Sequence, residues 1–329
     1  MKINDITEKA LIREIKKEFL TSKPGLMLGI GDDAAVIKTG KKSFILTKDL
    51  LLEKTHFYRD RHPPFFLGRK SLNVNLSDIA AMGGCPLYSL LGLGLPGKTS
   101  TEWVEEFMAG IKSACEEFDV VLAGGDICQA EVISISVTVI GEGKHIIKRS
   151  GAKPGDLIYV SGNLGDSAQG LQLVKKGIQL GEDKEKDIFL KAFFNPYPQV
   201  VLGKAISKNK TASSMIDVSD GLSVDLNHIC EESGVGAEIF VDRIPFSKEM
   251  KLFQDDVMEI CMHGGEDYNL LFTVPKHKKY RIDSLTKEYQ LSEIGKITTG
   301  KNIYLVRKDG HKEKLDIKGY QHFSKSSEQ

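Results

Sequence analysis

Aspartates recur in five short motifs of this 329-residue chain, and each motif follows apolar residues. The motifs are GIGDD (29–33), TKD (47–49), NLSD (75–78), AGGD (123–126) and DVSDG (217–221). Asp32 and Asp33 are adjacent, with no lysine or arginine next to them in sequence. Two unit charges about 4 Å apart repel by roughly 4 kcal/mol at an effective dielectric constant near 20, so something should compensate them. Any one motif is typical of a turn or helix cap, but five together favour a shared site.

An acidic cluster with few cations suits a divalent metal ion. Mg²⁺ takes oxygen ligands and often bridges carboxylates to phosphates. Softer metals fit less well, because the sequence has no Cys or His residues at metal-ligand spacing. Glycines in three of the motifs let a ligand approach the backbone closely. The motifs therefore predict a magnesium site for nucleotide phosphates, and they leave open whether Asp33 is a ligand or only a turn residue.

The common nucleotide-binding motifs do not explain these acids. The sequence contains no G-x-x-x-x-G-K-[ST] loop and no protein-kinase signature set. Weak G-x-G-x-x-[GA] matches occur at 29–34 and 92–97. The first would place two acids against a pyrophosphate and the second contains Pro96, so neither favours a dinucleotide site.

Composition excludes several other classes. Forty-five basic residues balance forty-five acidic ones, so nothing favours a nucleic-acid partner. The five cysteines are scattered with no C-x-x-C pair, which argues against a zinc site or a disulfide framework and suits a reducing cytoplasm. The start of the chain lacks the apolar region of a signal peptide, and no apolar run is long enough to span a membrane.

Hydrophobic periodicity predicts alternating helices and strands, which indicates an α+β or α/β fold. In the first half we expect a helix near the N-terminus, then strand 43–49 ending at Asp49, helix 65–82, strand 86–96, helix 101–118, a short buried strand 120–126 ending at Asp126, and half-buried strand 132–140. In the second half we expect a strand from 157, helix 165–177, a charged loop at 181–187, helix 197–208, a strand from 214 followed by a helix, strand 268–275, and a hairpin around 309–310.

The Gly/Pro-rich stretch 149–156 marks a domain boundary. We expect an N-terminal α/β domain over residues 1–148. A C-terminal α/β domain over 149–323 would complete the site, and 324–329 would be a disordered tail.

The motifs, taken in order, closely resemble the thiamine-monophosphate kinase family. The resemblance rests on GIGDDAAVI, TKDLLLEKTHF, NLSDIAAMGG, LAGGD, RSGAKPGD, DVSDGL, HGGEDYNLLF and GYQHF, which run from about residue 25 to residue 323. That family belongs to the superfamily of aminoimidazole ribonucleotide synthetase.

The resemblance implies a fold and a reaction. ATP would phosphorylate thiamine monophosphate to thiamine diphosphate by direct in-line transfer, with several Mg²⁺ ions and no residue acting as acid or base. Phosphoryl transfer needs mainly positioning and charge neutralisation, which an acidic metal cradle supplies. The implied fold has two domains, of which the N-terminal one (1–148) carries dimerisation and ATP and metal binding. Its sheet would form a barrel with that of a second subunit in a homodimer.

The resemblance also implies roles for particular residues. The implied metal ligands are Asp32, Thr47, Asp49, Asp78, Asp126, Asp217 and Asp220. The implied ATP contacts are Gly125, Asp126, Arg149, Ser219 and Met108, and the implied contacts to thiamine monophosphate are His56, Glu266 and Tyr320. Two positions depart from the family pattern: Lys48 replaces a usual Ser or Thr, and Met108 replaces a tyrosine that commonly contacts the base.

The sequence leaves three alternatives open. A sister enzyme of the superfamily would act on another acceptor; selenophosphate synthetase, however, would carry a reactive Cys or selenocysteine in an N-terminal glycine-rich segment, and the first cysteine here is Cys85. A nucleotide-binding dimer without catalysis is motivated only by Lys48 and Met108. A structural protein whose acids are all turns and caps would show no stabilisation by Mg²⁺.

Overall fold

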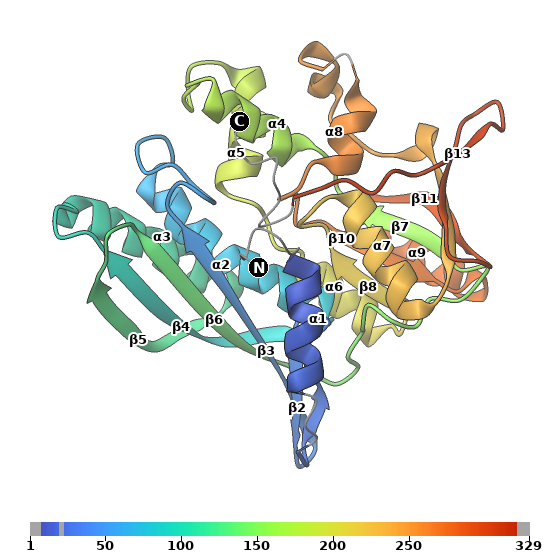
Figure 1. The fold of residues 1–329 in the computed structure, drawn as a ribbon, viewed down its shortest axis with the longest axis horizontal. Helices are drawn as coiled ribbons and strands as arrows, with labels where there is room; N and C mark the ends of the chain where they lie inside the picture. The colour runs from blue at the N-terminus through green and yellow to red at the C-terminus, as the bar shows by residue number, and fades with distance from the viewer. Residues whose placement is uncertain (1–7, 20–22, 255, 321–329) are drawn as a thin grey trace.

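The computed structural model describes residues 8–19, 23–254 and 256–320, and it contains two mixed sheets with helices packed on them (Figure 1). The tail expected at 324–329 lies outside the described residues. None of the helices in the described ranges combines the length and apolar character needed to cross a bilayer.

The first sheet has six strands in the order β1-β2-β3-β6-β4-β5. Its strands are β1 (Leu26–Leu28), β2 (Ala35–Thr39), β3 (Lys42–Leu52), β4 (Cys85–Leu95), β5 (Val121–Gln129) and β6 (Ser134–Gly143). All neighbours are antiparallel except β4 and β5, which are parallel and are joined through a helix.

Helices α2 (Pro64–Ala81) and α3 (Thr101–Phe118) pack together on one face of this sheet (Figure 1). They approach closely through glycines, since a Cβ on Gly68 would lie 2.1 Å from the Phe107 carbonyl oxygen and one on Gly110 only 1.9 Å from that of Phe65. Helix α1 (Glu8–Glu18) precedes the sheet. The periodicity predicted α2 and α3 within one residue.

The second sheet has seven strands in the order β13-β12-β9-β11-β7-β10-β8. Its strands are β7 (Leu157–Ser161), β8 (Ser214–Asp217), β9 (Gly236–Phe240), β10 (Leu270–Val274), β11 (Leu291–Thr298), β12 (Ile303–Val306) and β13 (Lys312–Lys314). Its helices are α4 (Asp166–Lys175), α5 (Lys184–Phe194), α6 (Val200–Lys208), α7 (Leu222–Ser233), α8 (Val257–His263) and α9 (Lys279–Leu285). The hairpin expected around Asp309-Gly310 is the turn between β12 and β13.

Helix α2 lies at the centre of the molecule (Figure 1), in contact with β3 and β6 of the first sheet and with α6 and β8 of the second half. Most of its residues are buried, including the polar Lys70, Asn73, Asn75 and Ser77. A helix buried all round is normally apolar, so its buried polar residues require partners supplied by other elements.

The strand expected to be short and buried at 120–126 is instead an exposed edge strand. β5 runs on to Gln129, it pairs only with β4 within the described sheet, and every one of its residues is exposed. A short apolar run looks the same in sequence whether the strand is buried in its own core or is covered by another molecule. Asp126 therefore lies within a strand rather than at its end.

Two further expectations were wrong in detail. The predicted loop 181–187 contains the start of α5, where Asp183 caps the helix by accepting a hydrogen bond from the Glu185 amide. The charged residues form the solvated first turn, and the buried Phe189 and Phe193 follow only later. Strand β3 continues three residues past Asp49, so Asp49 lies in the body of the strand.

Candidate active site

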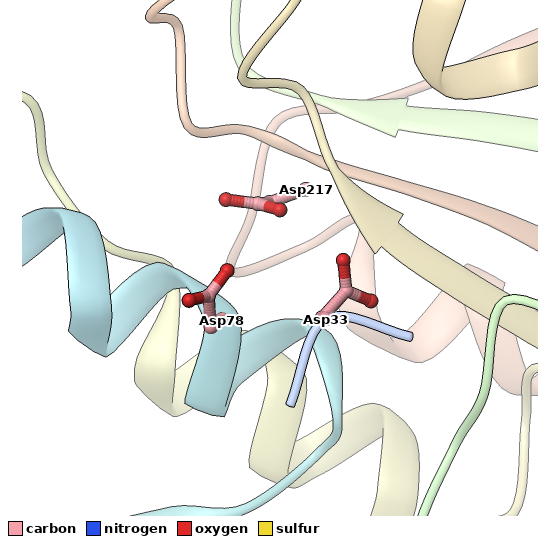
Figure 2. Close-up of side chains that lie close together, drawn as sticks. All are labelled: Asp33, Asp78 and Asp217. Carbon is pink, nitrogen blue, oxygen red and sulfur yellow. The ribbon is translucent and has the colours of Figure 1, made fainter. Parts of the chain in front are cut away.

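Three of the aspartates lie together between the two halves of the chain. Asp33 comes from the loop before β2, Asp78 from α2 and Asp217 from the end of β8 (Figure 2). One carboxylate oxygen from each lies within 4.8 Å of those of the other two. Residues 45 to 184 positions apart in sequence thus converge on one small, largely buried volume.

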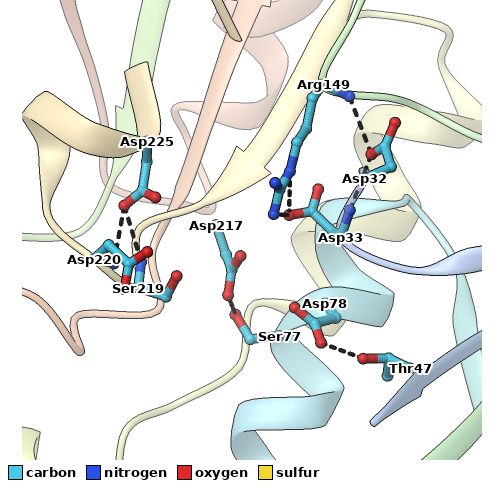
Figure 3. A network of polar contacts seen from close by, with 10 residues as sticks. All are labelled: Asp32, Asp33, Thr47, Ser77, Asp78, Arg149, Asp217, Ser219, Asp220 and Asp225. Carbon is cyan, nitrogen blue, oxygen red and sulfur yellow. Dashed lines mark hydrogen bonds and ion pairs between the residues drawn. The ribbon is translucent and has the colours of Figure 1, made fainter. Parts of the chain in front are cut away.

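Each carboxylate is held by a neighbour (Figure 3). Asp217 accepts a 2.6 Å hydrogen bond from the Ser77 hydroxyl, and Asp78 accepts one from the Thr47 hydroxyl. Asp33 forms an ion pair with Arg149, whose Nη2 and Nε lie 2.7 and 3.0 Å from the same oxygen, Oδ1. The other oxygen of Asp33, Oδ2, is buried and has no hydrogen-bond partner among the described residues.

Arg149 supplies the compensating charge that adjacent acids require. It pairs with Asp33 through its side chain, while its backbone amide donates to Oδ1 of Asp32 at 3.3 Å. Burial alone would lower the pKa of Arg149, but the charge of Asp33 and the hydrogen bonds to it raise that pKa overall. The expected compensation therefore comes at least partly from a residue distant in sequence.

Burial and mutual repulsion make these carboxylates reluctant to ionise. Burial, with the charge of Asp33, raises the pKa of Asp217 to about 7, and burial raises that of Asp49 to about 6. Burial and the neighbouring aspartates raise the pKa of Asp78 well above its ordinary value. Burial raises the pKa of Asp32 to about 6, with a further contribution from Asp33.

These residues fit a hard divalent cation. The converging donors are carboxylate oxygens, with the Thr47 hydroxyl beside them, and Oδ2 of Asp33 is an anionic oxygen without a partner in the described part of the chain. Such an oxygen is costly to bury unless something binds it. An all-oxygen donor set is the kind that Mg²⁺ prefers.

The DVSDG turn is organised by Asp225, an aspartate outside the five motifs. Oδ2 of Asp225 accepts hydrogen bonds of 3.1–3.2 Å from the backbone amides of Ser219, Asp220 and Gly221. Asp225 lies in the first turn of α7. Acidic residues are enriched in the first turn of helices, and this was the sequence signal that could have identified it. It shapes the loop that carries Ser219 and Asp220.

The two expected metal ligands of β3, Thr47 and Asp49, share one face of the strand, and Lys48 lies on the other. Thr47 faces Asp78, while the Asp49 amide donates to the Asn75 side chain and the Asp49 charge contributes to the raised pKa of Asp78. Side chains alternate along a strand, so Lys48 points the other way, and its ammonium donates to the Ser136 hydroxyl on β6. The departure at Lys48 therefore leaves the acidic cluster untouched.

Asp126 lies away from this cluster in the described chain. Strands β6 and β4 separate β5 from β3, so at the usual strand spacing Asp126 is about 14 Å from the β3 residues. Its neighbour Gly125 is required by packing, because a Cβ there would lie 1.9 Å from the Leu91 carbonyl oxygen. Met108 is partly buried on α3 and packs against the core of the first half.

The residues expected to contact thiamine monophosphate lie on three loops. Nδ1 of His56 accepts a 2.9 Å hydrogen bond from the Leu52 amide at the end of β3. Tyr320 is 48% exposed, and its amide donates to the Asp220 carbonyl oxygen at 3.3 Å. Glu266 forms a 2.8 Å ion pair with Lys70, a buried residue of α2 that the sequence analysis did not select.

Comparison with known proteins shows the same architecture elsewhere. Residues 31–142 match the AIR synthase related protein, N-terminal domain, and residues 153–308 match the AIR synthase related protein, C-terminal domain. The chain is 37% identical to the thiamine-monophosphate kinase of Aquifex aeolicus (strain VF5), over 98% of this chain and 100% of that protein. It is 35% identical to the thiamine-monophosphate kinase of Escherichia coli (strain K12), over 96% and 98%.

Solved structures of related proteins have the same fold as this chain. The structure of AaThiL complexed with AMPPCP and TMP matches with a TM-score of 0.88 at 36% identity, covering 98% of this chain and 99% of that one. The hydrogenase maturation protein HypE in complex with ATP shares the fold, with a TM-score of 0.69 at 17% identity and 96% coverage of both chains. Because the similarity spans both AIR synthase related domains and nearly the full length of the relatives, the chain belongs to the thiamine-monophosphate kinase family.

Proposed function

We propose that this protein transfers the terminal phosphoryl group of ATP to thiamine monophosphate, giving ADP and thiamine diphosphate. The observation that carries the proposal is the buried convergence of Asp33, Asp78 and Asp217, joined to Arg149, in a chain that is similar over its full length to thiamine-monophosphate kinases. The solved relative complexed with AMPPCP and TMP supports the pairing of an ATP-like nucleotide with this substrate.

The acidic cluster would hold Mg²⁺ through Asp33, Asp78 and Asp217, with Asp32, Thr47, Asp49 and Asp220 around it. When bound, Mg²⁺ neutralises phosphate charge and aligns the two phosphates for in-line transfer. Arg149 offers a planar cation to the ATP phosphates, beside Ser219 on the loop organised by Asp225. Glu266 and Tyr320 would face the cationic thiazolium, for which a carboxylate and an aromatic ring are suitable partners.

The activity is tested by measuring ADP release from ATP and Mg²⁺ with and without thiamine monophosphate, and by identifying thiamine diphosphate by mass. We expect ADP release to depend strongly on thiamine monophosphate and to stop when EDTA removes the metal. If the protein releases no ADP with thiamine monophosphate, yet is stabilised by Mg²⁺ and ATP, the acceptor is wrong and a sister enzyme is favoured.

We further propose a homodimer in which the first sheets of two copies close into a barrel. Strands β3, β4 and β5 of this sheet leave large apolar side chains exposed, among them Leu50 at 50%, Tyr88 at 48%, Val121 at 57% and Ile127 at 71%. Apolar surface of this kind, gathered on neighbouring strands, is typical of an interface. An uncovered edge strand such as β5 is also a liability in a monomer.

The dimer accounts for Asp126, which is too far from the cluster of its own chain to share a metal with it. We propose that Asp126 of one copy completes the site of the other. D126N should remove most turnover and leave the melting temperature nearly unchanged, because the exposed carboxylate is replaced by an amide of similar volume. Measurement of kcat beside a thermal melt checks both expectations; near-normal activity would contradict a metal role for Asp126.

Mixing two inactive variants tests whether Asp126 acts across the dimer. D126N and D217N subunits that exchange at random should recover about a quarter of wild-type activity, because each mixed dimer contains one intact site. If Asp126 acts within its own chain, both sites of the mixed dimer are defective. No recovery after demonstrated subunit exchange would then contradict the trans arrangement.

A further inference from the structure

Lys70 has an unusual environment for a lysine. Its side chain is fully buried in the middle of α2. The ammonium forms a 2.8 Å ion pair with Glu266, donates a 3.0 Å hydrogen bond to the Phe193 carbonyl oxygen, and lies 4.0 Å from the centre of the Phe193 ring. The ammonium has three N–H donors and no acceptor. These contacts therefore fix the Lys70 side chain in one position.

Such an arrangement adds little to stability by itself. Removing a lysine and a carboxylate from water costs several kcal/mol per ion, which the pair roughly repays only when its geometry is good. Apolar residues of similar volume often stabilise a protein as well or better. The pair therefore calls for an explanation in terms of what Glu266 does.

The loop that carries Glu266 is fixed on its other sides. Glu266 has a positive φ of 66°, unfavourable for a residue with a side chain. Its amide donates to the Ser219 carbonyl oxygen at 2.8 Å, and the Tyr268 amide donates to that of Val218 at 2.8 Å. Asp267 accepts a 2.8 Å hydrogen bond from the Gly165 amide at the start of α4. The backbone is thus tied to the acidic DVSDG turn, which leaves the Glu266 side chain to be oriented by Lys70.

We propose that Lys70 is a positioning residue for thiamine monophosphate, because it fixes the carboxylate of Glu266 relative to the metal-binding acids. This inference rests on the proposed function, in which Glu266 contacts the thiamine part of the substrate. The side chain of Glu266 remains 27% exposed, so one part of it can face a ligand while Oε1 binds Lys70. Lys70 and Asp78 lie on the same helix, about two turns apart, so one rigid element sets the place of both.

The sign of the effect separates positioning from simple electrostatics. Lys70 is a cation close to the carboxylate proposed to bind the thiazolium cation. If charge alone mattered, removal of Lys70 would strengthen the binding of thiamine monophosphate. If Lys70 positions Glu266, its removal leaves the carboxylate free to turn toward water or the metals, and binding weakens.

The test compares K70M, K70R and the matched control R69M in steady-state assays of the full-length enzyme with ATP and Mg²⁺. For K70M we expect KM for thiamine monophosphate to rise about tenfold or more, with kcat and KM for ATP changed by less than about threefold. K70R keeps the charge and should retain part of the affinity. Arg69 is the neighbouring buried cation, but it binds Glu117 and Ser113 on α3, so R69M should lower stability without changing the ratio of the two KM values.

The double variant K70M/E266Q gives a second measure. If Lys70 acts through Glu266, adding K70M to E266Q should raise KM for thiamine monophosphate little beyond its value in E266Q alone. The inference is overturned if K70M lowers that KM, leaves it unchanged, or raises both KM values equally. Should K70M not fold, the same criteria apply to K70R. A wild-type protein that does not use thiamine monophosphate would instead contradict the proposed function.

Discussion

D217N should abolish most of the activity while making the metal-free protein more stable at pH 8. Asp217 is buried beside Asp33, and its pKa is raised from 3.8 to about 7. Because the folded protein holds this proton more tightly than the unfolded chain, stability falls as the pH rises from about 4 to about 7. The amide that D217N introduces cannot ionise, so the variant escapes a cost of up to about 4 kcal/mol.

The activity should change in the opposite direction. The new amide oxygen can still accept the hydrogen bond from Ser77, so the local structure is kept, but an anionic ligand is lost from the proposed magnesium site. We expect kcat to fall by about a hundredfold or more, as when one group is removed from a preorganised charge-stabilising site. Melting curves in EDTA at pH 4.5 and pH 8, beside kcat with Mg²⁺ and ATP, measure both effects.

D283N is the matched control, because Asp283 is an exposed aspartate on α9. It should change neither kcat nor the pH dependence of melting. The gain in melting temperature of D217N over wild type should be several times smaller at pH 4.5 than at pH 8, where it should reach several degrees. If the gain were the same at both pH values, repulsion within the cluster would not be its cause.

The sequence predicted those helices and strands whose apolar spacing shows the element type directly, whatever packs against them. Helices α2 and α3 follow from apolar spacing and clear end signals, and strand β6 follows from strict alternation. The exposure of β5 could not be predicted, because Val121 and Leu122 look like core residues whether their own chain or a second copy covers them. Helix α5 was missed because its charged first turn masks an apolar face that begins only at Phe189.

Of the three clustered acids, Asp78 and Asp217 were expected in the site and Asp33 was left open. Of the two cations, Arg149 was expected only through the family resemblance, and Lys70 was not expected. Asp78 and Asp217 stand out because they recur in acidic motifs that follow apolar residues, and the fold brings them together. Arg149 and Lys70 look like ordinary basic residues in sequence, and their importance lies in contacts with Asp33 and Glu266 more than a hundred positions away. Local pattern does not carry information about such pairs, since they depend on how the two halves pack.

The second large effect concerns the pair between Asp33 and Arg149. D33N leaves the guanidinium largely buried without its anion, and arginine cannot neutralise itself by losing a proton. Breaking a buried pair from one side is strongly destabilising. Since the Arg149 side chain is 22% exposed, water compensates part of the loss, and we expect a decrease in unfolding free energy of about 2–4 kcal/mol.

At pH 6, R149M should lower the free energy of unfolding less than D33N does. The loss caused by R149M should then grow as the pH rises. Burial acts to raise the pKa of Asp33, and the charge of Arg149 with its hydrogen bond acts to lower it, so without Arg149 this carboxyl can take up a proton and become neutral. In R149M, Asp33 can be neutral at pH values below its raised pKa, and it becomes charged as the pH rises through that pKa. Urea unfolding of the metal-free variants at pH 6 and pH 8 measures the asymmetry, and D33N/R149M, which retains neither charge, should recover much of the loss caused by D33N. A D33N protein as stable as wild type, or an R149M cost independent of pH, would mean that Arg149 does not compensate the charge of Asp33.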